Sequence, residues 1–155
     1  LFDVSGQGLA AGLVALLSKS IIDEEFSKNP KEHLGTILKN ISQAILEKKG
    51  NVENYLKGAL LRFNGDKVEY VNAGSPTVYL RSGKTGKCSP VELPNSSSTD
   101  ELTIGRGTSA NSDFKVIGFK MNPGDSLILY SKALAEGKDS LGNAYSKTRI
   151  AKVFG

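Results

Sequence analysis

The stretch LFDVSGQGLAAGLVALLSKSI, residues 1–21, decides the fold. It places a short, mostly apolar segment, Leu1–Val4, before a glycine-containing turn and a long run of apolar residues with helical spacing. We therefore predict the end of a strand at residues 1–4 and a helix at residues 9–26. Because apolar residues fall on most sides of this helix, we expect it to be buried over most of its circumference.

Asp3 is the acidic residue at the end of the expected strand, and two interpretations of it are open. A carboxylate near a helix start is favoured by the helix dipole and can cap the first turn. Asp3, however, lies several residues before the helix. An acid at the tip of a strand can instead project into a cleft and bind a divalent cation, together with the neighbouring main-chain carbonyl.

The remaining pattern predicts an α+β fold, with helices packed against one face of a sheet. We expect a second, amphipathic helix that opens at Pro30 and ends at Lys48-Lys49-Gly50. Its apolar residues have helical spacing and are Leu34, Ile37, Leu38, Ile41 and Ile45. Strands are expected at residues 55–63, 67–73, 77–83, 87–93, 114–121 and 126–130, a polar loop at 93–101, a loop or short helix at 131–145, and a short helix near residue 146.

The amino-acid composition limits the kinds of metal site that the chain can form. The 155 residues are the size of one domain, and we expect a single domain over residues 1–155. One cysteine and one histidine exclude an intramolecular disulfide, a cysteine metal cluster and the usual multi-histidine zinc site. Any metal site must therefore use oxygen ligands, which suits magnesium, manganese or calcium.

Charge and hydropathy exclude two classes of partner. The net charge of +4 comes from lysines scattered along the chain, without a basic block interleaved with aromatics, so we expect no nucleic-acid binding. The longest apolar stretch, Leu9–Leu17, is far shorter than the ~20 residues that cross a bilayer. The chain begins at Leu1 in an expected strand and ends in apolar sequence, from which we expect a piece of a longer protein.

Several residues with reactive side chains have simpler structural interpretations. We expect His33 on the polar side of the second helix and Asp66 and Asp125 in turns. Cys88 has no histidine nearby in the sequence, so a catalytic thiol has little support. The stretch GKTGK, residues 83–87, joins two expected strands and does not open a helix, unlike a phosphate-binding loop.

Four stretches, taken in order, resemble one family. They are DVSGQGLAAGLVALL at residues 3–17, VEYVNAGSPTVYLRSGKTG at 68–86, MNPGDSLILYSKALAE at 121–136 and GNAYSKTRI at 142–150. Together they resemble the bacterial metal-dependent serine phosphatases (phosphatase 2C-like) of the stage II sporulation protein E and sigma-factor-regulation type. The resemblance covers nearly the whole chain.

The resemblance implies an α-β-β-α sandwich, here incomplete at both ends. It also implies two or more Mn2+ or Mg2+ ions that activate a water for attack on phosphoserine or phosphothreonine. The central metal-bridging aspartate of the family matches Asp3, and the carbonyl of Val4 matches a second ligand. The implied substrate is a small anti-sigma-factor antagonist of the STAS type.

Three positions depart from the family pattern. A metal-ligand aspartate is replaced by Lys132, the glycine that follows it by Ala133, and a histidine by Ser75. A lysine ammonium cannot ligate a dication and repels it. Two functions follow as alternatives: a protein serine/threonine phosphatase, or a catalytically inactive phosphatase-like domain that binds a signalling partner.

The resemblance also sets expectations for partners and location. We expect a phosphoprotein substrate or a regulatory protein as the partner, and no membrane lipid. We expect a cytoplasmic domain, as the output part of a larger sensor protein. Open sheet edges would favour a homodimer.

Overall fold

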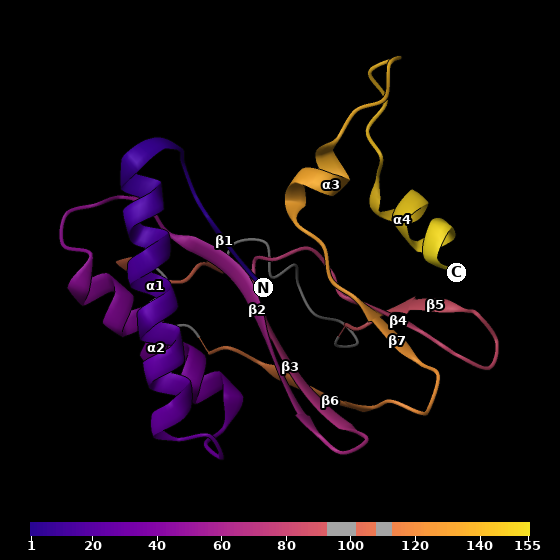
Figure 1. The fold of residues 1–155 in the computed structure, drawn as a ribbon, viewed down its shortest axis with the longest axis horizontal. Helices are drawn as coiled ribbons and strands as arrows, with labels where there is room; N and C mark the ends of the chain where they lie inside the picture. The colour runs from indigo at the N-terminus through magenta and orange to yellow at the C-terminus, as the bar shows by residue number, and fades with distance from the viewer. Residues whose placement is uncertain (93–101, 108–112) are drawn as a thin grey trace. The chain divides into compact units, whose positions relative to one another are not determined.

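The computed structural model describes residues 1–92, 102–107 and 113–155. The polar loop expected at 93–101 lies outside these residues. The chain divides into two compact units (Figure 1). Unit 1 comprises residues 1–62, 69–75 and 98–116, and unit 2 comprises residues 63–68, 76–97 and 117–155.

Unit 1 packs two helices against antiparallel strands. Its elements are β1 (Phe2–Val4), α1 (Gly8–Lys28), α2 (Leu34–Lys48), most of β2 (Leu56–Asn64) and most of β3 (Lys67–Ala73). β1 lies antiparallel to β2, with Asp3 opposite Lys57. The sheet to which these strands belong has the order β1-β2-β3-β6, where β6 is Val116–Lys120.

α2 is the amphipathic helix expected from the sequence. All five apolar residues that define its spacing are at most 2% exposed, and they join the core of unit 1 with Leu56 of β2 and Val71 of β3. The helix starts at Leu34 and not at Pro30, so the prediction that Pro30 opens it is wrong. Pro30 lies in the turn between the helices, and His33, at the N-cap position, is exposed as expected.

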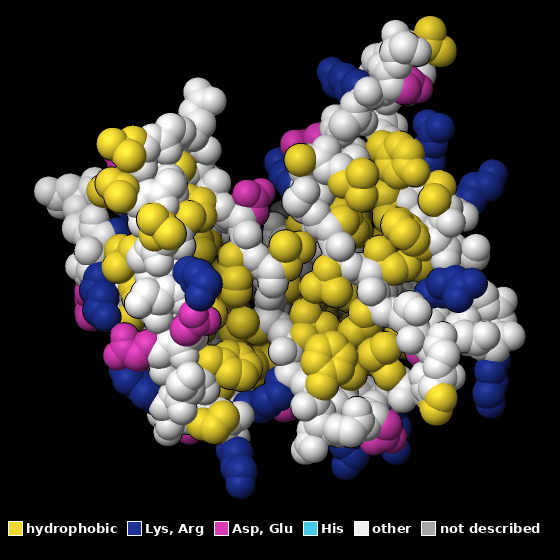
Figure 2. Space-filling model, viewed as in Figure 1, with side chains coloured by type: hydrophobic (Ala, Val, Ile, Leu, Met, Phe, Trp, Pro, Cys, Tyr) yellow, Lys and Arg dark blue, Asp and Glu magenta, His cyan; other side chains and the backbone are white. Residues whose placement is uncertain are grey.

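α1 departs from expectation in its burial. Leu9, Leu13 and Leu16 are 80%, 58% and 70% exposed, and only Val14, Ser18 and Ile21 are fully buried. Figure 2 shows apolar side chains on the outer face of this helix. The prediction of burial over most of the circumference is therefore wrong, because α1 rests on the core of unit 1 along one side only.

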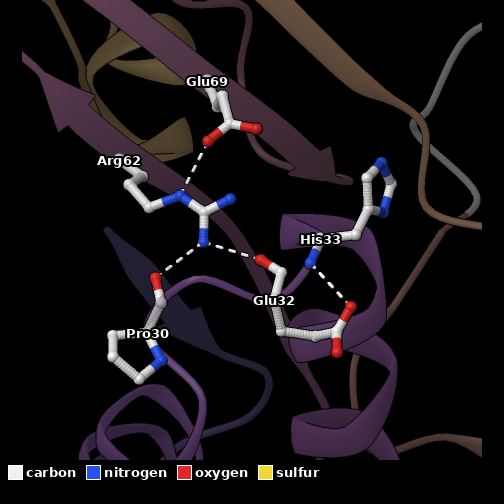
Figure 3. A network of polar contacts seen from close by, with 5 residues as sticks. All are labelled: Pro30, Glu32, His33, Arg62 and Glu69. Atoms are coloured by element: carbon white, nitrogen blue, oxygen red, sulfur yellow. Dashed lines mark hydrogen bonds and ion pairs between the residues drawn. The ribbon is translucent and has the colours of Figure 1, made fainter.

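Arg62 on β2 makes hydrogen bonds to the segment that joins α1 and α2 (Figure 3). Its Nε donates to Glu69 at 2.7 Å, and its Nη1 donates to the carbonyl oxygens of Pro30 at 2.9 Å and Glu32 at 2.6 Å. This hydrogen bond from Arg62 lowers the pKa of Glu69. The guanidinium thus fixes, with several donors at once, a turn that lacks regular secondary structure.

Unit 2 contains a second antiparallel sheet. Its order is β5-β4-β7, formed by β4 (Tyr79–Arg81), β5 (Cys88–Pro90) and β7 (Ser126–Ile128). Two short helices follow, α3 (Lys132–Glu136) and α4 (Lys147–Phe154). A small core of Tyr79, Tyr130 and Ile150 joins the sheet to α4. The expectations of strands, of a short helix within 131–145 and of a helix near residue 146 are confirmed.

Two turns of unit 2 meet through Asp125. Its carboxylate accepts hydrogen bonds from the backbone N–H of Gly83 at 2.9 Å and of Asn122 at 2.7 Å. A Cβ atom on Gly83 would lie 2.4 Å from the backbone of Gly124, so glycine is required for this approach. The structural interpretation of Asp125 is confirmed. These bonds, above all the one from Gly83, lower its pKa.

We expect the stabilising effect of Asp125 to disappear in acid. Because its pKa is lowered in the folded state, the ionised carboxylate stabilises the fold above the unfolded value of about 3.9, and this contribution is lost as the pH falls through the folded pKa. The unfolding temperature of the native chain should exceed that of Asp125→Asn at neutral pH, and the two should converge in acid. Asp66→Asn, in another exposed turn, is the control. A difference that is constant with pH contradicts this prediction.

None of the helices within the described ranges is both long enough and apolar enough to cross a membrane.

Candidate metal site

Asp3 lies at the middle of β1 in unit 1, and its side chain is exposed. Val4, the next residue, is half-buried and packs against the core of unit 1. The short strand is held by β2, where Lys57 faces Asp3 in the register. The packing of Val4 thus anchors the strand, while the side chain of Asp3 is exposed.

The turn after β1 is fixed by hydrogen bonds to residues 54 and 55. Ser5 donates its backbone N–H to the carbonyl of Tyr55 at 2.8 Å, and its Oγ accepts from the N–H of Tyr55 at 2.8 Å. The side-chain amide of Asn54 donates to the carbonyl of Ser5. The backbone N–H and the carbonyl of Ser5 are therefore both held by hydrogen bonds. This fixes the course of the backbone directly after Asp3 and Val4.

Gly6 shows why the turn contains glycine. Its φ is +83°, in the left-handed region, and a Cβ atom there would lie 2.6 Å from Nδ2 of Asn54. A side chain at this position would displace the amide that holds Ser5. The glycine turn is thus part of the support of the Asp3 segment.

Asp3 does not cap α1. The N-cap residue of this helix is Gln7, and no side chain makes a capping hydrogen bond there. The capping alternative for Asp3 is therefore wrong.

Lys132 is the first residue of α3, in unit 2. Its ammonium lies 3.0 Å from the carboxylate of Glu136, one helical turn further on, and both side chains are more than 60% exposed. Lys132 has three N–H donors and no acceptor, so it cannot act as a ligand for a cation. Its positive charge is partly balanced by Glu136, as in other exposed pairs four residues apart.

The acidic ligands for a metal centre are sparse. Among the residues that the structure describes, no three of the His, Cys, Asp and Glu side chains form a group that could hold a metal ion. Asp3 and Lys132 belong to different units. One carboxylate and one main-chain carbonyl do not by themselves fit a site for two dications, which prefer several oxygen ligands each. The described part of the chain therefore does not supply a complete metal centre.

Ser75, in place of the family's histidine, is 8% exposed and lies in a turn that Asn72 organises. The Asn72 side chain accepts from the N–H of Ser75 at 2.8 Å and donates to its carbonyl at 3.0 Å. Gly74 has a φ of +70°, and a Cβ on it would meet the carbonyl of Leu102 at 2.4 Å. Sequence reasoning missed Asn72, although Asn two residues before a glycine is a common turn signal.

With the fold and these residues described, the family can be assigned. The family model of stage II sporulation protein E (SpoIIE) matches residues 1–155, which is the whole chain. The chain belongs to the SpoIIE family. No curated protein matches the chain in a sequence comparison.

Solved structures show that this SpoIIE-family chain has the PP2C phosphatase fold. The SiaA-PP2C domain of Pseudomonas aeruginosa is similar with a TM-score of 0.77 and 17% identity, over 97% of this chain and 57% of that one. A structure of the RsbU and RsbW domains of Rv1364c from Mycobacterium tuberculosis has a TM-score of 0.71 and 21% identity, over 98% of this chain and 39% of that one. The fold class predicted from the sequence, α+β of the metal-dependent phosphatase type, is confirmed.

A third structure of this fold holds metal. The catalytic domain of the serine/threonine protein phosphatase PstP, in complex with two manganese ions, is similar with a TM-score of 0.53 and 16% identity, over 99% of this chain and 78% of that one. The SpoIIE-family chain spans 57% of the first of these relatives and 39% of the second.

Proposed function

We propose that this SpoIIE-family chain is a protein serine/threonine phosphatase domain in which Asp3 and the carbonyl of Val4 hold Mn2+ or Mg2+. The observation that carries the proposal is the position of Asp3, an exposed carboxylate that caps no helix and precedes a glycine turn pinned by Asn54 and Tyr55. Such rigid backbone support is what a metal ligand requires. The manganese-containing PstP structure of the same fold supports the choice of metal.

The proposed substrate is a phosphorylated regulatory protein of the anti-sigma-factor-antagonist type. Family membership supports this class of substrate. When bound, the metal would activate water for attack on a phosphoserine or phosphothreonine. Further acidic ligands would have to come from outside the described residues, because these supply no suitable cluster.

We further propose that the two units belong to one domain, located in the cytoplasm.

A second function is favoured by Lys132. An ammonium where the family carries a ligand carboxylate, and the lack of a carboxylate cluster among the described residues, support an inactive domain that binds a signalling protein. Its partner would also be a protein.

A homodimer through the exposed edge of β1 is compatible with either function, since β1 stands at the end of the strand order.

The first experiment measures hydrolysis by the whole protein that carries this chain. p-Nitrophenyl phosphate and a phosphoserine peptide are offered with and without manganese, to the native protein and to Asp3→Ala. We expect manganese-dependent turnover that Asp3→Ala lowers at least ~100-fold, because even partners that only support a ligand are worth about 10- to 100-fold. Native protein without turnover in manganese would overturn the phosphatase proposal and leave the binding module.

A control separates loss of metal from loss of fold. Asp23→Ala removes an exposed carboxylate of α1 whose partner is Lys19, one helical turn away. It should leave turnover unchanged. Manganese binding, measured by calorimetry, should be lost in Asp3→Ala and retained in Asp23→Ala. Equal manganese affinity in the two variants would contradict the role of Asp3 even if both are inactive.

A further inference from the structure

The positive charge of the chain belongs to one of its two units. Unit 2 contains ten Lys and Arg against five Asp and Glu, whereas unit 1 contains ten against eleven. The net charge of +4 therefore arises entirely in unit 2. Both units carry ten basic residues, so the excess of positive charge in unit 2 comes from its smaller number of acidic residues.

Within unit 2, the β4–β5 hairpin and residues 149–154 of α4 carry five Lys and Arg residues. They are Arg81, Lys84, Lys87, Arg149 and Lys152, and we call them the cationic surface. α4 packs against β5, so this helix lies beside the hairpin that carries Arg81, Lys84 and Lys87. The position of a Cβ atom on Gly155, at the end of α4, lies 3.7 Å from the Cβ of Cys88 and 3.8 Å from the carbonyl oxygen of Gly86. Figure 2 shows dark blue side chains along this edge of the unit.

Little negative charge balances this surface. Lys84 lies near enough to Asp125 to contribute to the lowering of its pKa, and Arg149 does the same for Asp139. Arg149 also stacks over the ring of Tyr145, at 5.0 Å from its centroid. In the described ranges of the chain, Arg81, Lys87 and Lys152 form no ion pair. Like charges held together without counter-charges destabilise a fold, and an anionic partner would relieve this.

Apolar side chains adjoin the cations on α4. Val153 is 60% exposed and Phe154 is 41% exposed, and both follow Lys152 directly. Ile150, one helical turn before them, is fully buried and holds α4 to its sheet. Cations mixed with exposed apolar residues fit a protein partner, whose interfaces combine both. A nucleic acid would be held mainly through phosphates.

We propose that the cationic surface docks an acidic segment of a partner protein, and that Val153 receives an apolar side chain of that segment. That the partner is the phosphoprotein substrate rests on the proposed function, whereas the docking itself does not. Docking at such a surface would select the substrate protein through residues other than the phosphorylated one.

The test uses synthetic, unphosphorylated fluorescein-labelled peptides and fluorescence anisotropy at about 0.15 M salt. The first peptide is rich in glutamate and contains leucines, and the second has glutamine in place of every glutamate. We expect the acidic peptide to bind and the glutamine peptide not to bind. Lys87→Glu combined with Lys152→Glu should weaken binding about tenfold, because each change replaces an attraction with a repulsion.

The matched control is Lys31→Glu combined with Lys39→Glu, which makes the same change in net charge on exposed residues of unit 1. It should alter binding less than about threefold, because neither lysine belongs to the cationic surface and salt screens exposed charges that the peptide does not contact. Equal weakening by the two double variants would overturn the proposal, since net charge alone would then explain binding. So would tighter binding of an oligothymidine than of the acidic peptide, or no binding of that peptide.

A separate variant tests the proposed apolar contact of Val153. Val153→Ser should weaken the leucine-containing acidic peptide about threefold and leave a leucine-free acidic peptide unchanged. An equal effect on both peptides would overturn the assignment of Val153. Thermal unfolding of each variant checks the fold, which these exposed positions should not disturb. Peptide binding is measured without any hydrolysis. The docking proposal can therefore be tested even if the chain has no phosphatase activity.

Discussion

Lys132→Asp is expected to tighten manganese binding about 100-fold. The change removes one positive charge and adds one negative charge at the position where the family carries a ligand. At a ligand position, a change of two charge units beside a dication would be worth roughly 2–3 kcal/mol even in a water-like medium. In the phosphatase proposal, this gain is accompanied by faster hydrolysis. The measurement is a manganese titration of the native protein and the variant by calorimetry.

The control for Lys132→Asp is Lys138→Asp, another exposed lysine of unit 2. It makes the same change in charge outside the family motif and should leave the affinity within about threefold. A gain that Lys138→Asp reproduces would show that Lys132 does not occupy a metal-ligand position.

Leu38→Ala is expected to lower the free energy of unfolding by about 3–5 kcal/mol. Leu38 is 0% exposed on α2 and belongs to the core of unit 1. Its truncation removes buried methyl groups and leaves a cavity, and the two costs add. The measurement is urea-induced unfolding followed by circular dichroism, with the midpoint and slope compared between the native chain and the variant.

Leu13→Ala on α1 is the matched control for Leu38→Ala, because the same atoms are removed from a side chain that is 58% exposed. It should change the free energy of unfolding by no more than about 0.5 kcal/mol. If Leu13→Ala were as costly as Leu38→Ala, the outer face of α1 would have to be covered in solution.

The two helices show where sequence reasoning succeeds and where it fails. α2 alternates apolar and polar residues at helical spacing, so its buried face could be predicted residue by residue. α1 is apolar on nearly all sides over its first half, so its pattern carries no information about which side meets the core. The exposure of Leu9, Leu13 and Leu16 is decided by which side of α1 packs on the core in the completed fold.

The candidate site was predicted only in part. Asp3 stands out locally, because an acid between an apolar strand and a glycine turn is unusual. The supports of its segment, Asn54 and Tyr55, lie about fifty residues further along the chain and carry no local signal. The same holds for Arg62, whose acceptors include carbonyl groups thirty and thirty-two residues away. Contacts between a side chain and a distant backbone depend on the completed fold.

The exposed start of α1 also affects how easily that helix unfolds locally. No side chain of Gly8–Leu13 is fully buried, whereas the rest of the helix carries the buried residues Val14, Ser18 and Ile21. Local unfolding has the lowest free energy where few buried contacts are broken. We therefore expect the amide protons of the first turns of α1 to exchange with solvent through local fraying, and those of α2 to exchange only through larger openings. The residues beside Asp3 thus adjoin the least protected end of a long helix.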